Sequence, residues 1–259
     1  MAANNRYESF GLQDRVAIVT GASQGIGKAL ADGLAQAGAH VALVSRTREK
    51  LEEAAQEILA QGRQALVAPA DLRSVDAIRA MVRHVHEHFG RIDILINNAA
   101  WTDTRPALEV SEDEWDRTME TSLKSVFFAS QAVAPIMIEQ GKGSIVNIGS
   151  TLGVVAFAGR PVYGAAKAGV HQLTRCLAYE WAEKGIRVNS MAPCVTETPT
   201  RQNLFSNPEY REWVTREMFP IRRWAQPEDL VGATLFLCSD MAAMMVGHVM
   251  LVDGGWTIH

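Results

Sequence analysis

The chain has 259 residues, of which 47% are hydrophobic and 21% charged, values typical of a globular protein with one large core. Its net charge of −4 offers no basic surface to nucleic acid or to an anionic membrane, so neither is expected as a partner. Three cysteines without metal-ligand spacing, and a polar N-terminus without a secretory signal, indicate a cytoplasmic protein that binds no metal.

A polar segment over residues 1–14 is expected to form a loose leader. Beyond it, short runs of apolar and β-branched residues alternate with helical patterns. The expected strands cover residues 16–20, 41–45, 65–69, 94–97, 144–148, 187–191 and 248–252. Residues 75–89 form one of the helical patterns, with its apolar side chains on a single face. This alternation predicts an α/β fold: a Rossmann-type doubly wound parallel sheet of about seven strands with helices on both faces.

No linker, repeat or low-complexity run divides the sequence, so residues 1–259 are expected to form a single domain. The apolar stretch over 231–252 is interrupted by Asp240 and His248, which favours a core helix and strand over a membrane span. In a sheet of this kind, ligands bind at the carboxyl ends of the strands, near the point where the strand order reverses.

A glycine-rich loop, TGASQGIG over residues 20–27, follows the first expected strand and precedes a helical pattern. Glycines permit a tight turn, let the backbone approach a pyrophosphate, and direct helix N-terminal N–H groups toward it. An ordinary glycine-rich turn is the alternative, but the position between strand and helix favours dinucleotide binding. The expected cofactor contacts in this loop are Gly21, Ser23, Gln24, Gly25, Ile26 and Gly27.

The end of the second expected strand indicates which nicotinamide cofactor is bound. An acidic residue there would accept a hydrogen bond from the ribose 2′-hydroxyl of NAD, whereas arginine accommodates the 2′-phosphate of NADP. This chain has Ser45 and Arg46 and no acid, and Arg46 offers charge-assisted hydrogen bonds to a phosphate. We therefore expect NADP(H) in preference to NAD(H); the alternative is that Arg46 is only a solvated charge at a helix start.

Tyr163 and Lys167 are four residues apart in an expected helix, so their side chains share one face. A phenol alone has a pKa near ~10 and is a weak acid–base group at neutral pH, but an adjacent ammonium would stabilise the phenolate. Ser150, after the strand over 144–148, could hydrogen-bond a substrate oxygen. Taken alone, the pair of Tyr163 and Lys167 would fit a surface helix better than a catalytic site.

In chain order the sequence carries TGASQGIG at 20–27, Asp71, NNAA at 97–100, Ser150, YGAAK at 163–167, Pro193, Thr198 and VDGG at 252–255. Over about residues 12–257 it resembles the classical short-chain dehydrogenases/reductases, which transfer a hydride between nicotinamide and a carbonyl or alcohol carbon. The resemblance implies that Tyr163 is the general acid/base, that Lys167 assists it and holds the nicotinamide ribose, and that Ser150 orients the substrate. It implies further cofactor contacts at Asp71, Leu72, Asn98, Ala99, Ala100, Tyr163, Lys167, Pro193, Val195 and Thr198.

Three positions depart from the family pattern. Ser122 stands where the family has an asparagine that helps to hold a proton-relay water, and serine is shorter with a single donor. Ser122 is therefore a candidate for the relay role. Ala100 and Cys194 each stand where the family has glycine, so each adds a side chain beside the cofactor. We expect Cys194 to be a plain small side chain and not a reactive thiol.

Loops around the expected site, including a substrate lid over about 195–220, would set the specificity. Four aromatic residues lie in them: Trp101, Phe157, Phe205 and Trp213. They indicate either a pocket for an apolar ketone or ordinary lid packing. Arg105 and Arg160 could instead hold a carboxylate. The first hypothesis is therefore a small ketone or secondary alcohol substrate, and a sugar acid such as gluconate is the alternative.

An enzyme is the leading hypothesis because both Tyr163 and Lys167 are present. A non-catalytic NADP-binding regulator is the alternative from another class of protein, and only Ser122 favours it. His84, His86 and His88 lie off the apolar face of their helix, which indicates a solvated surface and not a metal site. The family resemblance also implies a homotetramer.

Overall fold

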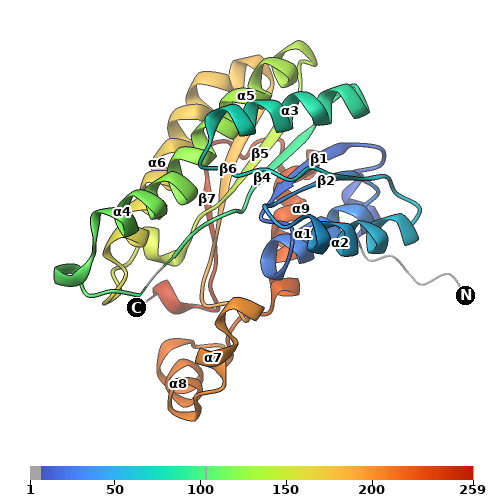
Figure 1. The fold of residues 1–259 in the computed structure, drawn as a ribbon. Helices are drawn as coiled ribbons and strands as arrows, with labels where there is room; N and C mark the ends of the chain where they lie inside the picture. Colours follow the sequence, from blue (N-terminus) through green and yellow to red (C-terminus); the bar gives the residue numbers. More distant parts are fainter. Residues whose placement is uncertain (1–6, 103, 259) are drawn as a thin grey trace, which may run out of the picture.

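Seven parallel strands form one sheet in the order β3-β2-β1-β4-β5-β6-β7, which confirms the predicted doubly wound fold (Figure 1). The computed structural model describes residues 7–102 and 104–258. The strands are β1 (Val16–Thr20), β2 (His40–Val44), β3 (Ala65–Val67), β4 (Ile94–Asn97), β5 (Gly143–Ile148), β6 (Ile186–Pro193) and β7 (Val249–Val252). β3 ends at Val67, earlier than predicted, although the backbone N–H groups of Ala68 and Ala70 still donate to Leu43 O and Ser45 O beyond it.

Two helical layers cover the sheet (Figure 1). One face carries α1 (Gly25–Gln36), α2 (Arg48–Ala60) and α9 (Val231–Cys238). The other carries α3 (Val75–Phe89), α5 (Ser125–Glu139) and α6 (Pro161–Trp181). α3 has the predicted bounds and buries Ile78, Met81, Val82 and Val85 from its apolar face. Burial of both faces explains why the strand sequences are nearly continuous apolar runs.

A continuous helical run leads into the core. It consists of α4 (Glu112–Met119), a π-helical turn at Glu120–Lys124, and α5. By length and composition the run Glu112–Glu139 is apolar enough to cross a membrane, and 44% of that apolar window is buried inside the structure. Val126, Val133 and Met137 of α5 are buried. The apolar character of this run therefore serves the protein core.

The strand order reverses between β1 and β4, which pair with each other while their successors β2 and β5 lie on opposite sides. The register places Val19 opposite Ile96, and the carboxyl-terminal residue of β5, Ile148, opposite Met191 of β6. The loops that follow β1, β4, β5 and β6 therefore meet at one edge of the sheet. This edge is where a doubly wound sheet binds its ligand.

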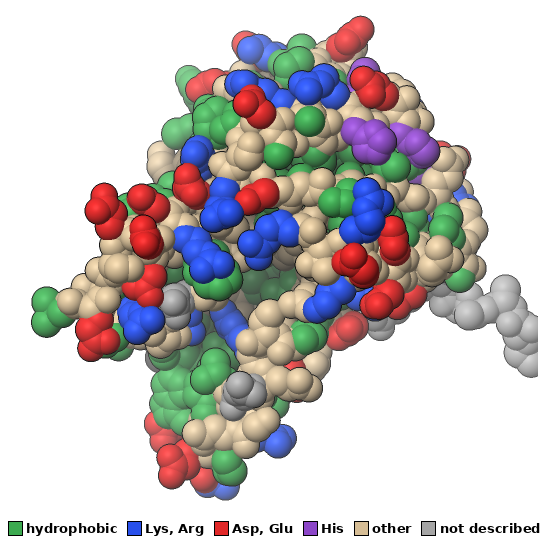
Figure 2. Space-filling view, in the orientation of Figure 1, with side chains coloured by type: hydrophobic (Ala, Val, Ile, Leu, Met, Phe, Trp, Pro, Cys, Tyr) green, Lys and Arg blue, Asp and Glu red, His purple; other side chains and the backbone are tan. Residues whose placement is uncertain are grey.

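A small helical lobe follows β6 and projects from this edge (Figure 1). It contains α7 (Gln202–Phe205), α8 (Pro208–Trp213) and a π-helical turn at Val214–Met218. The lobe occupies the segment predicted as a lid, and we call residues 195–220 the lid. A pocket opens between the lid and the strand ends, and Figure 2 shows Lys and Arg side chains around the hollow.

The predicted loose leader lies partly outside the described residues, which begin at residue 7. From there on the segment is not loose. Leu12 is fully buried in the core on the α1 side of the sheet, and Asp14 N donates a 2.9 Å hydrogen bond to Gly38 O. Isolated apolar residues such as Leu12 give no periodic pattern, so the sequence did not indicate this anchoring.

Candidate active site

The glycine loop lies between the end of β1 and the start of α1 at Gly25. Gln24, the N-cap residue, makes no side-chain capping bond within the described part of the chain, which leaves the first N–H groups of α1 for a ligand. Gly21 has φ of +67°, in the left-handed region. A Cβ at Gly27 would lie 2.2 Å from Gly21 O, so only glycine fits there. This compact loop at a helix N-terminus fits a pyrophosphate.

The pocket is basic beside the ends of β2 and β3, where Arg46, Lys50 and Arg73 line it. Arg73 Nη2 lies 2.7 Å from Asp71 Oδ2, and the hydrogen bond from Arg73 lowers the pKa of Asp71 to about 2. Lys50 Nζ donates to Gln24 Oε1 at 3.1 Å. Because Arg73 already neutralises Asp71, Arg46 and Lys50 give this end a net positive charge. The donor set fits the 2′-phosphate of NADP.

The loop after β4 is bound directly to the loop after β1. Thr20 Oγ1 accepts hydrogen bonds from the backbone N–H of Asn98 at 2.9 Å and of Ala99 at 3.0 Å. Asn98 Nδ2 donates to Thr20 O at 2.9 Å. These bonds fix the wall of the pocket that Asn98 and Ala99 form, before any ligand is bound.

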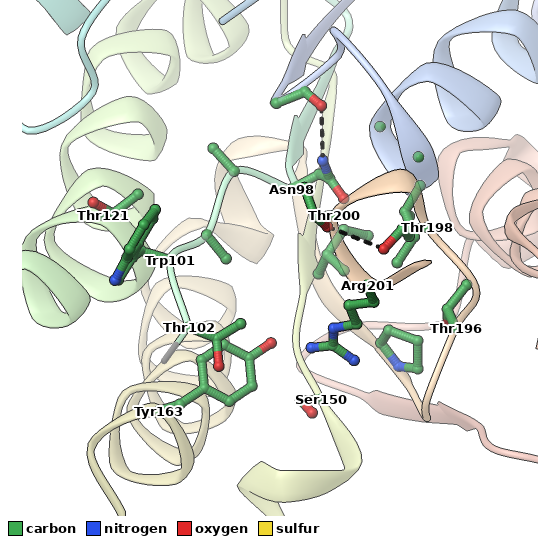
Figure 3. Close-up of a pocket in the computed structure, with 18 of the residues that line it drawn as sticks. Asn98, Trp101, Thr102, Thr121, Ser150, Tyr163, Thr196, Thr198, Thr200 and Arg201 are labelled. Atoms are coloured by element: carbon green, nitrogen blue, oxygen red, sulfur yellow. Dashed lines mark hydrogen bonds between the residues drawn. The ribbon is translucent and has the colours of Figure 1, made fainter. Parts of the chain in front are cut away.

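Tyr163 and Lys167 lie one turn apart near the start of α6. Tyr163 extends its ring into the pocket, and Ser150 lies on the neighbouring loop after β5 (Figure 3). Lys167 is 2% exposed, and its Nζ lies 5.6 Å from the centre of the Tyr163 ring and donates to Ile148 O at 2.6 Å. Burial lowers the pKa of Lys167, and nearby Tyr163 opposes that effect. Ser150 Oγ accepts from Leu152 N at 3.1 Å, so its hydroxyl proton can be donated to a ligand.

His171 lies one turn beyond Lys167 and is buried beneath the loop that carries Ser150. A Cβ at Gly149 would lie 2.2 Å from its Nε2, and one at Gly153 would lie 2.6 Å from its Cε1. Among the described residues, Nε2 has no hydrogen-bond partner. Burial, and then the charge of Lys167, lowers the pKa of His171 to about 4. A neutral imidazole therefore supports the loop that carries Ser150 at neutral pH.

Ser122 is fully buried in the π-helical turn and does not line the pocket in the described part of the chain. Its Oγ donates to Trp101 O and accepts from Trp101 N, both at 3.0 Å. The guanidinium carbon of Arg117 lies 3.6 Å from the centre of a Trp101 ring. The single hydroxyl proton of Ser122 is thus used to hold Trp101. These contacts give no support to the relay role expected for Ser122.

One pocket of about 490 Å³ brings the other predicted residues together (Figure 3). Ser150 lines it, and so does every predicted cofactor contact: Gly21, Ser23, Gln24, Gly25, Ile26, Gly27, Ser45, Arg46, Asp71, Leu72, Asn98, Ala99, Ala100, Tyr163, Lys167, Pro193, Val195 and Thr198. The sequence did not point to several residues at the other end of the pocket, which are Thr102, Arg117, Arg201, Leu204, Tyr210, Met218 and Trp256. Most of them come from the lid and the C-terminal segment, where no motif marks them.

The four aromatic residues of the flanking loops divide into two pairs. Trp101 and Phe157 line the pocket. Phe205 and Trp213 pack within the lid region: Phe205 lies 4.8 Å from Trp224 between ring centres, and Trp213 lies 6.0 Å from Phe157. The first pair therefore forms part of the pocket wall, and the second belongs to the packing of the lid region.

Of the two arginines considered for holding a carboxylate, only one lines the pocket. Arg105 Nε pairs with Glu114 Oε1 at 2.7 Å and lies outside this pocket, whereas Arg160 lines it and donates to Thr102 Oγ1 at 2.7 Å.

Burial raises the pKa of Cys194 to about 12, which keeps its thiol protonated and unreactive. Over residues 7–102 and 104–258, no three His, Cys, Asp or Glu side chains gather as a metal site.

The comparisons with known proteins agree with this geometry. The family model "Enoyl-(Acyl carrier protein) reductase" matches residues 21–257. Gluconate 5-dehydrogenase of Gluconobacter oxydans (strain 621H) is 41% identical over 249 residues, which cover 96% of this chain and 97% of that protein.

Two crystal structures have the same fold. A gluconate 5-dehydrogenase from Burkholderia cenocepacia J2315, in complex with NADP and tartrate, has a TM-score of 0.93 at 35% identity and covers 98% of this chain and 99% of its own. A short-chain type dehydrogenase/reductase from Mycobacterium marinum has a TM-score of 0.91 at 34% identity and covers 96% of this chain and 98% of its own. The chain belongs to the classical short-chain dehydrogenase/reductase family.

Proposed function

We propose that the chain is an NADP(H)-dependent oxidoreductase that interconverts a secondary hydroxyl and a ketone on a sugar acid. One observation carries this proposal: Tyr163, Lys167 and Ser150 meet the dinucleotide loop in a single pocket. The sugar-acid class is supported by the gluconate 5-dehydrogenase relative and by Arg160 and Arg201 at the substrate end. It replaces the small ketone of the first hypothesis as our preferred substrate.

NADP(H) is the proposed cofactor because the glycine loop suits a pyrophosphate and the end of β2 is basic. Arg46 and Lys50 would hold the 2′-phosphate through charge-assisted hydrogen bonds. The Burkholderia relative carries NADP, which supports the same choice here. Asn98, Ala99 and Thr198 would line the nicotinamide half of the cofactor.

The chemistry divides between the cofactor and the chain. When bound, nicotinamide supplies or takes up the hydride. In oxidation the Tyr163 oxygen takes the proton from the substrate hydroxyl as the carbon loses its hydride, and in reduction it returns that proton. The ammonium of Lys167, held by Ile148 O, stabilises the phenolate that forms. The Ser150 hydroxyl donates a hydrogen bond to the substrate oxygen and fixes the reacting carbon.

An apolar ketone is the second candidate substrate. Trp101, Phe157 and Trp256 line the pocket, and their rings offer apolar contact area to a substrate without charge. The arginines would then face water or the rest of the cofactor.

A substrate panel separates the candidates. The purified chain is assayed with D-gluconate and NADP, and with apolar ketones and NADPH, with NAD and NADH in parallel. We expect turnover of gluconate with NADP. Turnover of apolar ketones alone would replace the sugar acid by the second candidate. Tight NADPH binding without turnover of any substrate would favour the non-catalytic regulator.

We also propose that the chain acts as a cytoplasmic homotetramer. β7 is an edge strand, and exposed apolar side chains lie on it and just before it: Met244, Val246 and Leu251. Edges and patches of this kind favour contact with a second chain. Analytical ultracentrifugation tests the assembly, and a sedimenting species with the mass of one 28.3 kDa chain would contradict it.

A further inference from the structure

Arg201 is a pocket residue that the sequence motifs left unassigned. It ends the short turn Pro199–Arg201 of the lid, and its backbone N–H donates to Thr198 O at 2.9 Å. Figure 3 shows its guanidinium directed toward the part of the pocket that holds Tyr163 and Ser150. No carboxylate of the described residues pairs with this guanidinium.

Tyr210 shows that Arg201 lies at the substrate end of the pocket. Its ring lies 6.0 Å from that of Trp213, which in turn lies 6.0 Å from Phe157 on the opposite wall. Burial raises the pKa of Tyr210, and the positive charges of Arg201 and then Arg160 oppose that rise. Both guanidinium groups therefore act on the same hydroxyl, and all three residues line the one pocket.

The charges that line the pocket are unevenly distributed. Asp71 is the one lining carboxylate among the described residues, and Arg73 pairs with it at 2.7 Å. The substrate end holds Arg201, whose guanidinium pairs with no carboxylate of the described residues. In a partly enclosed site, charges of one sign raise the local concentration of the opposite ion. A guanidinium also matches the two oxygens of a carboxylate.

We infer that Arg201 is a specificity-determining residue that binds the carboxylate of the substrate from the lid. The inference rests on the proposed function and deepens it, because it assigns the residue that separates a sugar acid from a neutral polyol. Since Arg201 belongs to the lid, a carboxylate bound there links the lid to the substrate whose hydroxyl faces Tyr163. A neutral substrate lacks this contact and gains only the aromatic walls.

The test compares two substrates that differ at one carbon. D-Gluconate carries a carboxylate where D-glucitol carries a hydroxymethyl group, and both are oxidised with NADP by wild type and by Arg201→Gln. Arg216→Gln is the matched control, because Arg216 is an exposed lid residue, paired with Glu212 at 2.9 Å, that does not line the pocket. We expect Arg201→Gln to raise KM for gluconate by about 10- to 100-fold, the loss typical of one charge-assisted contact. Its kcat/KM for glucitol and its Kd for NADPH should match those of the control.

Three other results would contradict the proposed role of Arg201. An equal loss with both substrates would assign Arg201 to lid packing, a weaker Kd for NADPH would assign it to the cofactor, and an unchanged KM would remove its role. If wild type does not oxidise gluconate, the proposed substrate fails, and gluconate is then tested as an inhibitor of the reaction that the panel reveals. Inhibition that Arg201→Gln abolishes would still support the inference, and a lack of inhibition would overturn it.

Discussion

The ammonium of Lys167 lies 5.6 Å from the centre of the Tyr163 ring and is held there by a 2.6 Å hydrogen bond to Ile148 O. Because Lys167 is buried and bonded to the backbone, its position relative to Tyr163 does not depend on a bound ligand. A preorganised charge of this kind stabilises a phenolate without having to reorganise during the reaction. We therefore expect the Tyr163 hydroxyl to be the group that transfers the proton.

Replacing Tyr163 by Phe removes only that hydroxyl and keeps the ring. General acid–base groups typically contribute 10²- to 10⁴-fold, so kcat should fall by at least about 100-fold. NADPH binding and Tm should stay close to wild type, because the ring and its packing remain. Tyr179→Phe, an exposed change on the same helix, is the control and should keep full activity. A Tyr163→Phe enzyme with normal NADPH binding and near-wild-type turnover would disprove the mechanism.

Ser122 should act through Trp101 and not through a proton. Ser122→Ala leaves the N–H and C=O of Trp101 without their buried partner. The free energy of unfolding should therefore fall by about 1–3 kcal/mol, and Tm should fall with it. Turnover should fall as the Trp101 wall of the pocket shifts, while the pH–rate profile keeps its shape. Ser122→Thr retains the hydroxyl and should restore part of both losses. A changed pH–rate profile in Ser122→Ala at an unchanged Tm would instead restore the relay role.

Arg46 should decide the choice between NADP(H) and NAD(H). Loss of one charge-assisted contact to a phosphate costs about 1.5–3 kcal/mol, so Arg46→Ala should lower kcat/KM for NADPH by roughly 10- to 100-fold. The value for NADH should change little, because that cofactor has no 2′-phosphate. Arg48→Ala is the control, since Arg48 pairs with Glu52 at 3.5 Å and does not line the pocket. Equal kcat/KM for both cofactors in wild type would remove this role.

The sequence brought the residues proposed for catalysis and cofactor binding to one pocket because they have fixed spacing on regular elements. Tyr163 and Lys167 share a helix face by their spacing, and the glycine loop lies where β1 meets α1. The substrate side could not be predicted in the same way. Arg201 and Trp256 reach the pocket from short turns that show no hydrophobic period, so only the packing of the lid and the C-terminal segment places them there.

Ser122 illustrates a different limit. Its alignment with a family position gave the right neighbourhood, but a sequence does not specify which backbone groups a hydroxyl will contact. The bonds to Trp101 follow from the approach of the π-helical turn to the loop after β4, and that approach is a tertiary feature. Leu12 shows the same limit at the N-terminus, where a single buried side chain anchors a segment that has no pattern.

His171 should make the protein sensitive to acid. Its pKa is about 4 in the folded chain and 6.5 ordinarily, so between these values the unfolded chain binds a proton that the folded chain excludes. The free energy of unfolding therefore falls as the pH drops through this window, by up to roughly 3 kcal/mol, and the loss is absent above pH 6.5. His171→Leu removes this titration, so its stability should decline less between pH 7 and pH 4.5, whatever its stability at pH 7. His84→Leu, on the exposed face of α3, should decline as wild type does. Urea unfolding at fixed protein concentration measures the free energy of unfolding of all three proteins at each pH. If this free energy declined equally with falling pH in wild type and His171→Leu, His171 would not be held neutral in the fold.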